Sequence, residues 1–183
     1  MATFAQRMIG AAKLNAATYE EVEADKGATK QALVVVLLSA VAAGVGEFME
    51  GGEAMLGALL GALIGWVVWA FLTWLIGTKF LAGPQTQADV GQLLRTIGFA
   101  SSPGIFRVFG WIPILGPVIV IVTWVWMLAT TVVAVRQALD YTSTGKAILV
   151  CAIGWFVYAL IFIWTAAFVG FAIVGINAMM NAQ

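Results

Sequence analysis

The 183-residue sequence contains no histidine and a single cysteine, Cys151. Without imidazole, the chain lacks the side chain that ligates most catalytic zinc and that acts as base in Ser-His and Cys-His nucleophile pairs. One cysteine cannot form an internal disulfide, and Cys151 lies within an apolar run, where we expect it to fill space. We therefore expect no catalytic residue, no cofactor and no metal site, and a protein that is not an enzyme.

Charge is also scarce. Only 10% of the residues are charged and 62% are hydrophobic, whereas a soluble domain is about 25% charged and about 45–50% apolar. The net charge is zero, so we expect no nucleic-acid partner. Lipid leaves backbone groups unsatisfied unless a span is a helix or a closed barrel. The long apolar runs do not alternate as barrel strands do, so the predicted fold is an all-α, polytopic membrane protein.

Five apolar segments, separated by short polar loops, are predicted to be transmembrane helices. They comprise residues 31–49, 54–77, 91–109, 112–135 and 147–176. A spanning helix needs roughly 20 residues. The third segment is the weakest, since Arg95 and Arg107 bracket its apolar part and Pro103 interrupts it. It crosses the membrane if both arginines extend toward the headgroups; otherwise it is a re-entrant or interfacial segment.

Residues 3–25 are predicted to form an interfacial helix at the membrane surface. When the residues are placed on a helix at 100° per residue, the apolar ones form one face. This face contains Phe4, Met8, Ala11, Ala12, Tyr19 and Val22. Thr18 and Glu21 have capping-box spacing, which favours two short helices. A lid packed on the loops is the other interpretation.

The chain divides accordingly into three parts. We expect a cytoplasmic amphipathic segment at residues 1–29, a five-helix membrane domain at residues 30–176 and a short polar tail at residues 177–183.

The basic residues predict the orientation. Those flanking the spans are Arg7, Lys13, Lys26, Lys30, Lys79, Arg136 and Lys146. With five spans and a cytoplasmic N-terminus, all of them lie in the cytoplasm, as the positive-inside rule requires, and Arg107 is the exception. The C-terminus then lies outside. A four-span arrangement with the tail inside stays open.

Two groups of residues are candidates for a helix-packing or partner interface. Gly57, Gly61 and Gly65 recur every four residues, a spacing that lets another helix approach closely. Large aromatic residues near mid-span fill space within a bundle or against a neighbouring protein. These are Trp66, Trp69, Trp124, Trp126 and Trp164. Both groups are compatible with packing inside the protein.

Each group of charged residues near the membrane has a structural interpretation and a functional one. The loop between the first two spans contains three acidic residues, Glu47, Glu50 and Glu53. They are either solvated or form a weak site for a hard cation such as calcium. Arg95 and Arg107 are membrane-interface charges that extend toward water, or that contact a lipid headgroup or a partner carboxylate. The predicted spans contain no acidic residue, which disfavours a proton-coupled transporter.

Several short motifs occur in and after the third span. They are Leu93-Leu94-Arg95-Thr96-Ile97-Gly98-Phe99-Ala100, Ser102-Pro103, Ile112-Pro113-Ile114-Leu115-Gly116, Trp124, Val135-Arg136-Gln137-Ala138-Leu139 and Thr144-Gly145-Lys146-Ala147-Ile148. With these motifs the chain resembles the bacterial branch of the Yip-domain family, the Ypt/Rab-interacting membrane proteins, over about residues 30–176.

The resemblance implies a five-span integral membrane protein with a cytoplasmic N-terminus and no catalytic residue. Eukaryotic members are associated with Rab-type GTPases and vesicle traffic. This chain has only about 30 residues before its first span and lacks the Asp-Leu-Tyr-Gly-Pro motif of those members. Its short loops and lack of histidine look prokaryotic, so we expect it in the bacterial plasma (inner) membrane.

The resulting hypothesis is a non-enzymatic adaptor or accessory subunit of a larger membrane complex, or a membrane organiser. Its expected partners are the lipid bilayer, other integral membrane proteins and, in a homo-oligomer, further copies of the chain. The alternative is a conduit for lipid or small neutral solutes, with a hydratable groove that uses Ser101, Ser102, Thr123 and Thr130.

Overall fold

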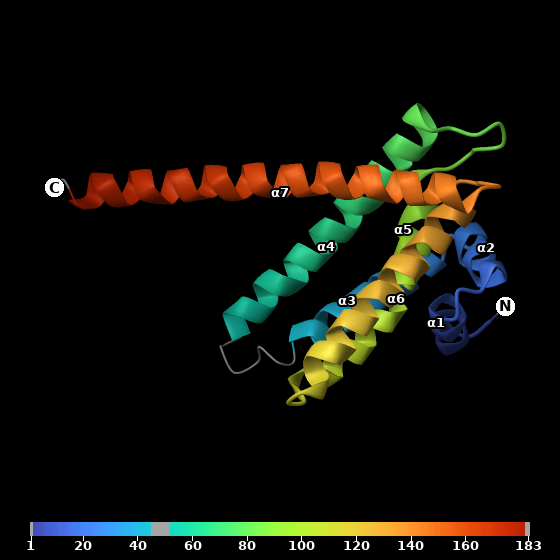
Figure 1. Ribbon diagram of the computed structural model, residues 1–183, viewed down its shortest axis with the longest axis horizontal. Coiled ribbons are helices and arrows are strands. Elements are labelled where there is room, and N and C mark those ends of the chain that lie inside the picture. The colour runs from blue at the N-terminus through green and yellow to red at the C-terminus, as the bar shows by residue number, and fades with distance from the viewer. Residues whose placement is uncertain (1, 45–51, 182–183) are drawn as a thin grey trace.

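The computed structural model describes residues 2–44 and 52–181, and every regular element in those ranges is helical (Figure 1). The α-helices are α1 (Phe4–Ala12), α2 (Ala16–Ala24), α3 (Ala28–Gly44), α4 (Gly52–Leu75), α5 (Val90–Ala100), α6 (Leu115–Ala138) and α7 (Thr144–Asn181). A π-helical turn, η2 (Ile76–Phe80), extends α4, and a 3₁₀ helix, η3 (Ser102–Trp111), follows α5. The all-α fold class is confirmed.

Within the described residues, three helices are long and apolar enough to cross a membrane. They comprise Met55–Phe80, Leu115–Ala138 and Thr144–Phe168. The shorter apolar helix Ala28–Gly44 and the α5–η3 segment lie where the first and third spans are predicted. Together these make five apolar helical segments, so the expected polytopic architecture of about five helices is confirmed.

The α5–η3 segment is longer than an α-helix with the same number of residues, because its second half is a 3₁₀ helix. A 3₁₀ helix rises about 2.0 Å per residue and an α-helix about 1.5 Å, so α5 and η3 together extend about 36 Å. Pro103 lies at the start of η3, where its missing N–H is tolerated. Gly98 and Gly104 let the segment approach α3 closely, because a Cβ atom at either position would clash with Ala32 or Ser39.

The N-terminal segment folds as two helices, in agreement with the two-helix interpretation. The side chain of Thr3 caps α1 in a capping box with Gln6, and Asn15 caps α2. Thr18, the predicted cap, lies inside α2 instead. The predicted apolar face packs against protein: Tyr19 and Val22 are fully buried in a cluster with Phe99 of α5.

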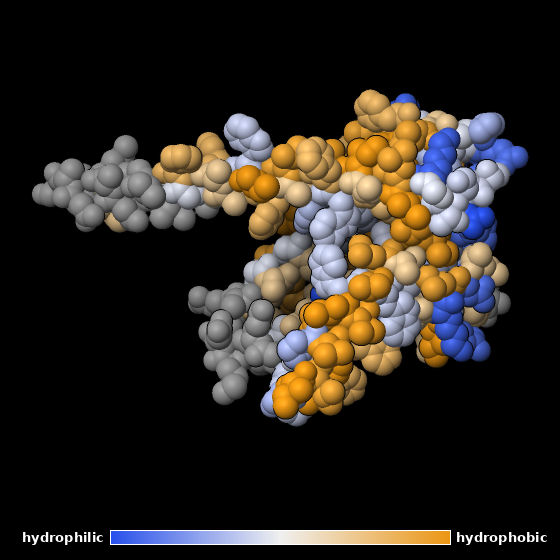
Figure 2. All heavy atoms as spheres, in the orientation of Figure 1, coloured by the Kyte–Doolittle hydropathy of each residue, from blue (hydrophilic) through white to orange (hydrophobic). Residues whose placement is uncertain are grey.

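Two of the remaining helices, α4 and α7, diverge from the others. In Figure 1, α3, α5 and α6 lie together with α1 and α2 beside them, while α4 and α7 extend away. The 38 residues of α7 reach about 57 Å and include residues 177–181 of the predicted tail. Figure 2 shows hydrophobic side chains over α6 and α7, and hydrophilic ones at the end of the molecule near α2. The divergence leaves a hollow between the helices.

Candidate functional site: an apolar cavity between the helices

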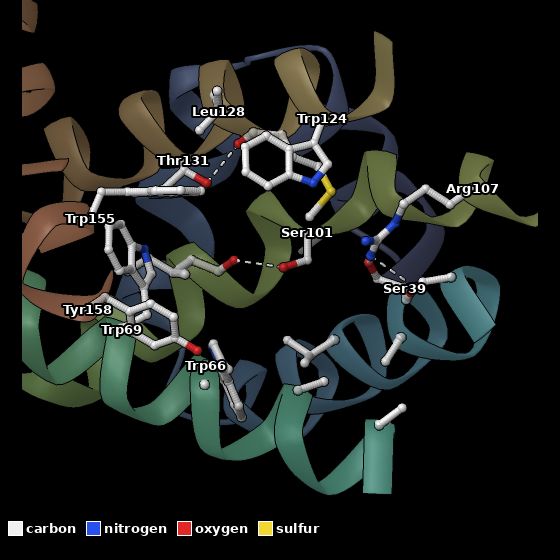
Figure 3. Close-up of a pocket in the computed structure, with 18 of the residues that line it drawn as sticks. Ser39, Trp66, Trp69, Ser101, Arg107, Trp124, Leu128, Thr131, Trp155 and Tyr158 are labelled. Atoms are coloured by element: carbon white, nitrogen blue, oxygen red, sulfur yellow. Dashed lines mark hydrogen bonds between the residues drawn. The ribbon is translucent and has the colours of Figure 1, made fainter. Parts of the chain in front are cut away.

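A cavity of about 620 Å³ lies where α3, α4, α5, η3, α6 and α7 meet (Figure 3). Most of its lining is apolar, and its largest side chains are aromatic. These are Trp66 and Trp69 from α4, Trp124 from α6, and Trp155, Tyr158 and Phe162 from α7. The volume falls in the range of about 300–1,000 Å³ that is typical of small-molecule sites.

Edge-to-face aromatic pairs hold the diverging helices at one side of the cavity. The rings of Trp124 and Trp155 lie 5.1 Å apart and join α6 to α7, and those of Trp69 and Tyr158 lie 6.2 Å apart and join α4 to α7. The indole N–H of Trp66 donates to the carbonyl oxygen of Leu94 at 3.1 Å, which ties α4 to α5. Such pairs favour T-shaped geometry, and buried indole N–H groups require an acceptor.

Small residues on α3 and α4 create the empty volume. Ala40 and Ala43 line it from α3, and Ala58, Ala62 and Gly65 line it from α4. Because these side chains are short, they cannot fill the space that the large aromatic residues leave open.

The polar side of the cavity is built around Arg107 of η3. Its Nη2 atom donates to the hydroxyl oxygen of Ser39 at 2.8 Å and to the carbonyl oxygen of Ser39 at 3.1 Å, and Nε donates to the carbonyl oxygen of Gly104 at 3.3 Å. Figure 3 places Arg107 and Ser39 at one edge, opposite Tyr158. Among the lining residues that the structure describes, Arg107 alone carries a charge.

Two further hydroxyl groups in the lining are satisfied within their own helices. Ser101 donates to the carbonyl oxygen of Ile97 at 3.4 Å, and Thr131 donates to that of Met127 at 2.7 Å. Of the residues predicted for a hydratable groove, Ser101 therefore lines the cavity. Ser102, Thr123 and Thr130 are buried elsewhere, and Thr130 bonds across to Ala100 at 2.7 Å.

The side chain of Arg95 does not lie where the position of this residue at the end of a span suggests. We expected it to extend toward the headgroups, but its side chain is only 6% exposed. Nε donates to the carbonyl oxygens of Val22 at 3.1 Å and Glu23 at 3.0 Å, so the guanidinium caps the C-terminus of α2. A cation there is favourable because the helix dipole is negative at that end. Arg95 and Arg107 therefore lie in separate places.

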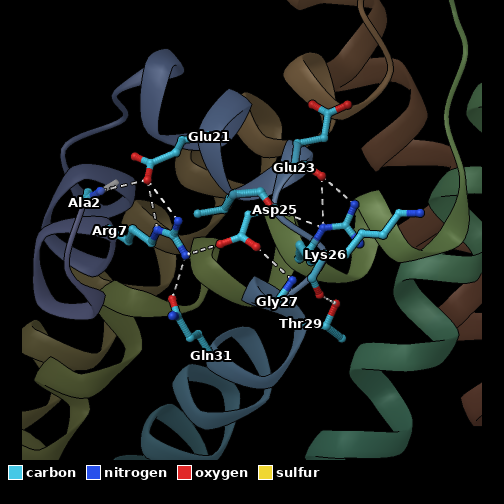
Figure 4. A network of polar contacts seen from close by, with 11 residues as sticks. Ala2, Arg7, Glu21, Glu23, Asp25, Lys26, Gly27, Thr29 and Gln31 are labelled. Carbon is cyan, nitrogen blue, oxygen red and sulfur yellow. Dashed lines mark hydrogen bonds and ion pairs between the residues drawn. The ribbon is translucent and has the colours of Figure 1, made fainter.

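Arg7 anchors the N-terminal helices in a second polar network (Figure 4). Its buried guanidinium forms ion pairs with Glu21 and Asp25, both at 2.9 Å, and donates to Gln31 of α3 at 3.0 Å. The guanidinium holds the pKa of the Asp25 carboxyl below its usual range, and the backbone N–H of Ala2 together with the guanidinium does the same for Glu21. The network fixes α1 and α2 against the start of α3.

Glu23 is the least satisfied charge near this network. It is 8% exposed, and one carboxylate oxygen accepts from Nε2 of Gln92 at 2.9 Å. The other oxygen has no hydrogen-bond partner among the described residues. Burial, with help from Glu20 and Asp140, raises the pKa of Glu23 to about 7.

The predicted interface residues separate into three groups. Trp66, Trp69, Trp124 and Gly65 line the cavity. Trp126 faces the N-terminal segment: its indole N–H donates to the carbonyl oxygen of Ala12 at 2.7 Å and its ring stacks on Phe106. Trp164 lies on the outer half of α7 and is 75% exposed.

The glycine strip is covered only at its end. A Cβ atom on Gly65 would lie 3.0 Å from the hydroxyl oxygen of Tyr158, whereas Gly57 and Gly61 have no neighbour within 4 Å of that position among the described residues. The predicted loop acids Glu47 and Glu50, and the side chain of Glu53, lie outside the described residues.

The sequence reasoning missed Ser39, Trp155 and Tyr158. Trp155, Tyr158 and Phe162 follow one another at helical i, i+3, i+7 spacing, and this was the available signal for a shared face on α7. Ser39 offers no signal of this kind, because only the contact with η3 gives it a role.

Comparison with known proteins identifies one family. The model of the Yip1 domain matches residues 15–178. No curated protein and no solved structure matches the chain. The match covers all five apolar helical segments and α2.

Proposed function

This chain belongs to the Yip1 domain family, and from that premise we propose that it is a non-enzymatic adaptor or accessory subunit of a larger membrane complex. The family and the apolar helices make it a multi-pass membrane protein in contact with the bilayer. The adaptor role requires a surface that receives another membrane protein. The glycine face of α4 meets that requirement best.

The observation that carries the proposal is the open space beside Gly57 and Gly61. Small residues allow the backbones of two membrane helices to approach closely, which gains van der Waals contact that lipid chains supply less well. Among the described residues, internal packing accounts for Gly65, which meets Tyr158, but not for the other two glycines. A transmembrane helix of a partner protein fits this face.

The face lies at the rim of the cavity rather than inside it. At 100° per residue, Ala58 and Ala62 lie one step around α4 from Gly57 and Gly61, and both alanines line the cavity. On the other side of the strip, Leu56, Leu60 and Ile64 are exposed. A partner helix on the glycines would border the cavity without filling it.

The orientation proposed for this assembly follows the basic residues. The end that carries α1, α2 and the 139–143 loop faces the cytoplasm, and the C-terminus of α7 lies on the opposite side of the inner membrane. Arg7 and Arg95 fix α1 and α2 as one unit on α3 and α5. In the proposed orientation this unit forms part of the cytoplasmic surface.

Purification from native membranes in mild detergent tests the adaptor role. We expect the chain to migrate on a native gel with a larger complex of fixed stoichiometry, with the partner identified by mass spectrometry. Gly61→Leu should release the partner, since the leucine side chain separates the helices. The matched control is Gly170→Leu, because Gly170 of α7 also has open space around it.

Two results would count against the adaptor role. One is migration of the wild-type chain alone or only with copies of itself. The other is equal loss of the complex in the Gly61 and Gly170 variants. That result would show that a leucine at any open helical glycine disrupts the complex and that the glycine face has no specific role.

The cavity favours a second candidate function, a conduit for lipid or small neutral solutes. Its volume of about 620 Å³ and the presence of Ser39, Ser101 and Thr131 give a chain or a solute a partly polar environment. The test is flux across liposomes that contain the purified protein alone. Flux that Ala62→Phe reduces would support the conduit, and absence of flux above that of protein-free liposomes would exclude it.

A further inference from the structure

The cavity, of about 620 Å³, has room for part of a lipid. Its aromatic and small apolar lining suits an acyl chain. The occupant of the cavity therefore differs in kind from the partner proposed for the glycine face.

Arg107 gives the cavity a charge that the lining does not neutralise. A guanidinium has five N–H donors. Nε and Nη2 donate to Gly104 and Ser39, whereas Nη1 has no acceptor among the described residues. The ion pairs found within the described residues both involve Arg7, so Arg107 is not paired with a carboxylate there. At least part of the Nη1 surface is accessible.

A cation at membrane depth is unfavourable unless it meets water, an anion or backbone carbonyls. Ser39 and Gly104 supply acceptors for part of the guanidinium and fix its orientation at the edge of the cavity. The fixed Nη1 side, which has no partner among the described residues, is complementary to an anion. A phosphate oxygen is a strong match, because a hydrogen bond between a guanidinium N–H and an ionised acceptor is roughly twice as strong as a neutral one.

We propose that the cavity binds one anionic glycerophospholipid, with its phosphate group on Nη1 of Arg107 and an acyl chain against Trp124, Trp155 and Phe162. Ser39 is a positioning residue that holds the guanidinium by two hydrogen bonds. The headgroup charge provides selectivity and the aromatic lining provides contact area. This site is independent of the glycine face, so either proposal can fail without the other.

Native mass spectrometry of the purified full-length chain tests the proposal. The protein is equilibrated in detergent with equal amounts of phosphatidylglycerol and diacylglycerol of identical chains, which lacks the phosphate, and the bound lipid is counted. We expect roughly tenfold more phosphatidylglycerol, the factor that one charge-assisted hydrogen bond supplies. Equal retention of the two lipids by the wild-type protein would overturn the proposal.

Two arginine variants separate the site from general charge effects. Arg107→Gln should abolish the preference. Arg136→Gln is the matched control, since Arg136 also donates to backbone carbonyls and to a hydroxyl but lies in the last turn of α6 and does not line the cavity. A preference that survives Arg107→Gln, or that Arg136→Gln removes equally, would contradict the assignment.

A third variant leaves Arg107 intact and tests the chain-binding part. Ala62→Phe fills the cavity and should reduce retention of both lipids several-fold while the protein keeps its helical circular dichroism. Unchanged retention would place the lipid elsewhere. Added inorganic phosphate should leave the bound phosphatidylglycerol in place, and its displacement would indicate a site for free anions instead of a lipid.

Discussion

At the scale of single residues, three arginines with similar sequence surroundings have three different roles. Arg7 pairs with two carboxylates, Arg95 caps the C-terminus of α2, and Arg107 binds α3 at the cavity edge. Hydropathy marks each of them only as a charge near an apolar segment. Their roles depend on which carbonyls and carboxylates the fold brings within reach, and this cannot be read from spacing along the chain.

Loss of the Arg7 side chain should loosen the N-terminal unit. Arg7→Ala removes two ion pairs and leaves Glu21 and Asp25 without their cation. Breaking a buried pair typically destabilises by about 3–5 kcal/mol, and we expect about 2–3 kcal/mol here because both carboxylates are partly exposed. Thermal unfolding in detergent measures this change. Lys13→Ala, an exposed change in the turn after α1, should leave the midpoint within the error of wild type.

Glu23 predicts a pH dependence of stability. Its pKa is about 7 in the folded protein against an ordinary value of 4.5, so the folded state holds a proton that the unfolded state releases. The contribution of Glu23 is therefore most favourable below pH 4.5 and is lost as the pH rises through about 7.

Glu23→Gln should remove that dependence. We expect the variant to unfold at a higher temperature than wild type at pH 8, and to approach wild type at pH 4.5, where the carboxyl is protonated in the folded state and half protonated in the unfolded state. Thermal unfolding of both proteins from pH 4.5 to 8 provides the measurement. A difference that stays constant over this range would show that burial does not raise the pKa of Glu23.

At the scale of elements, hydropathy predicted α4, α6 and α7 well because each is a long uninterrupted apolar run. The α5–η3 segment was harder to predict, since Arg95 and Arg107 bracket its apolar part and Pro103 interrupts it. Its 3₁₀ half and the contacts of Gly98 and Gly104 with α3 are tertiary features. The N-terminal helices were predicted as amphipathic, but the pattern alone did not distinguish lipid from α5 as the surface that their apolar face covers.

The close contact between α5 and α3 makes Gly98 sensitive to substitution. A Cβ atom there would lie 2.7 Å from the Cβ atom of Ala32 and 3.2 Å from its backbone, so α3 would have to move. We expect Gly98→Ala to destabilise by about 1–3 kcal/mol, the usual effect of overpacking. Gly57→Ala is the control, because that position has open space and alanine favours the helix. Equal unfolding midpoints for the two variants would contradict this packing.

At the scale of the whole molecule, divergence of α4 and α7 from the α3–α5–α6 group is the central feature. It creates both the cavity and the uncovered glycine face. The sequence indicated the residues of both surfaces, including Gly57, Gly61, Trp66, Trp69 and Trp124. It did not indicate that the tryptophans enclose a cavity while two of the glycines stay outside it, because that depends on the angles between helices.

The most direct test of the adaptor role is photo-crosslinking in native membranes from a photoreactive residue at position 61, with position 170 as the reference. We predict that position 61 crosslinks to one integral membrane protein at high yield, and that position 170 gives mainly lipid adducts. Crosslinks from position 61 only to lipid, or the same products from both positions, would contradict the account.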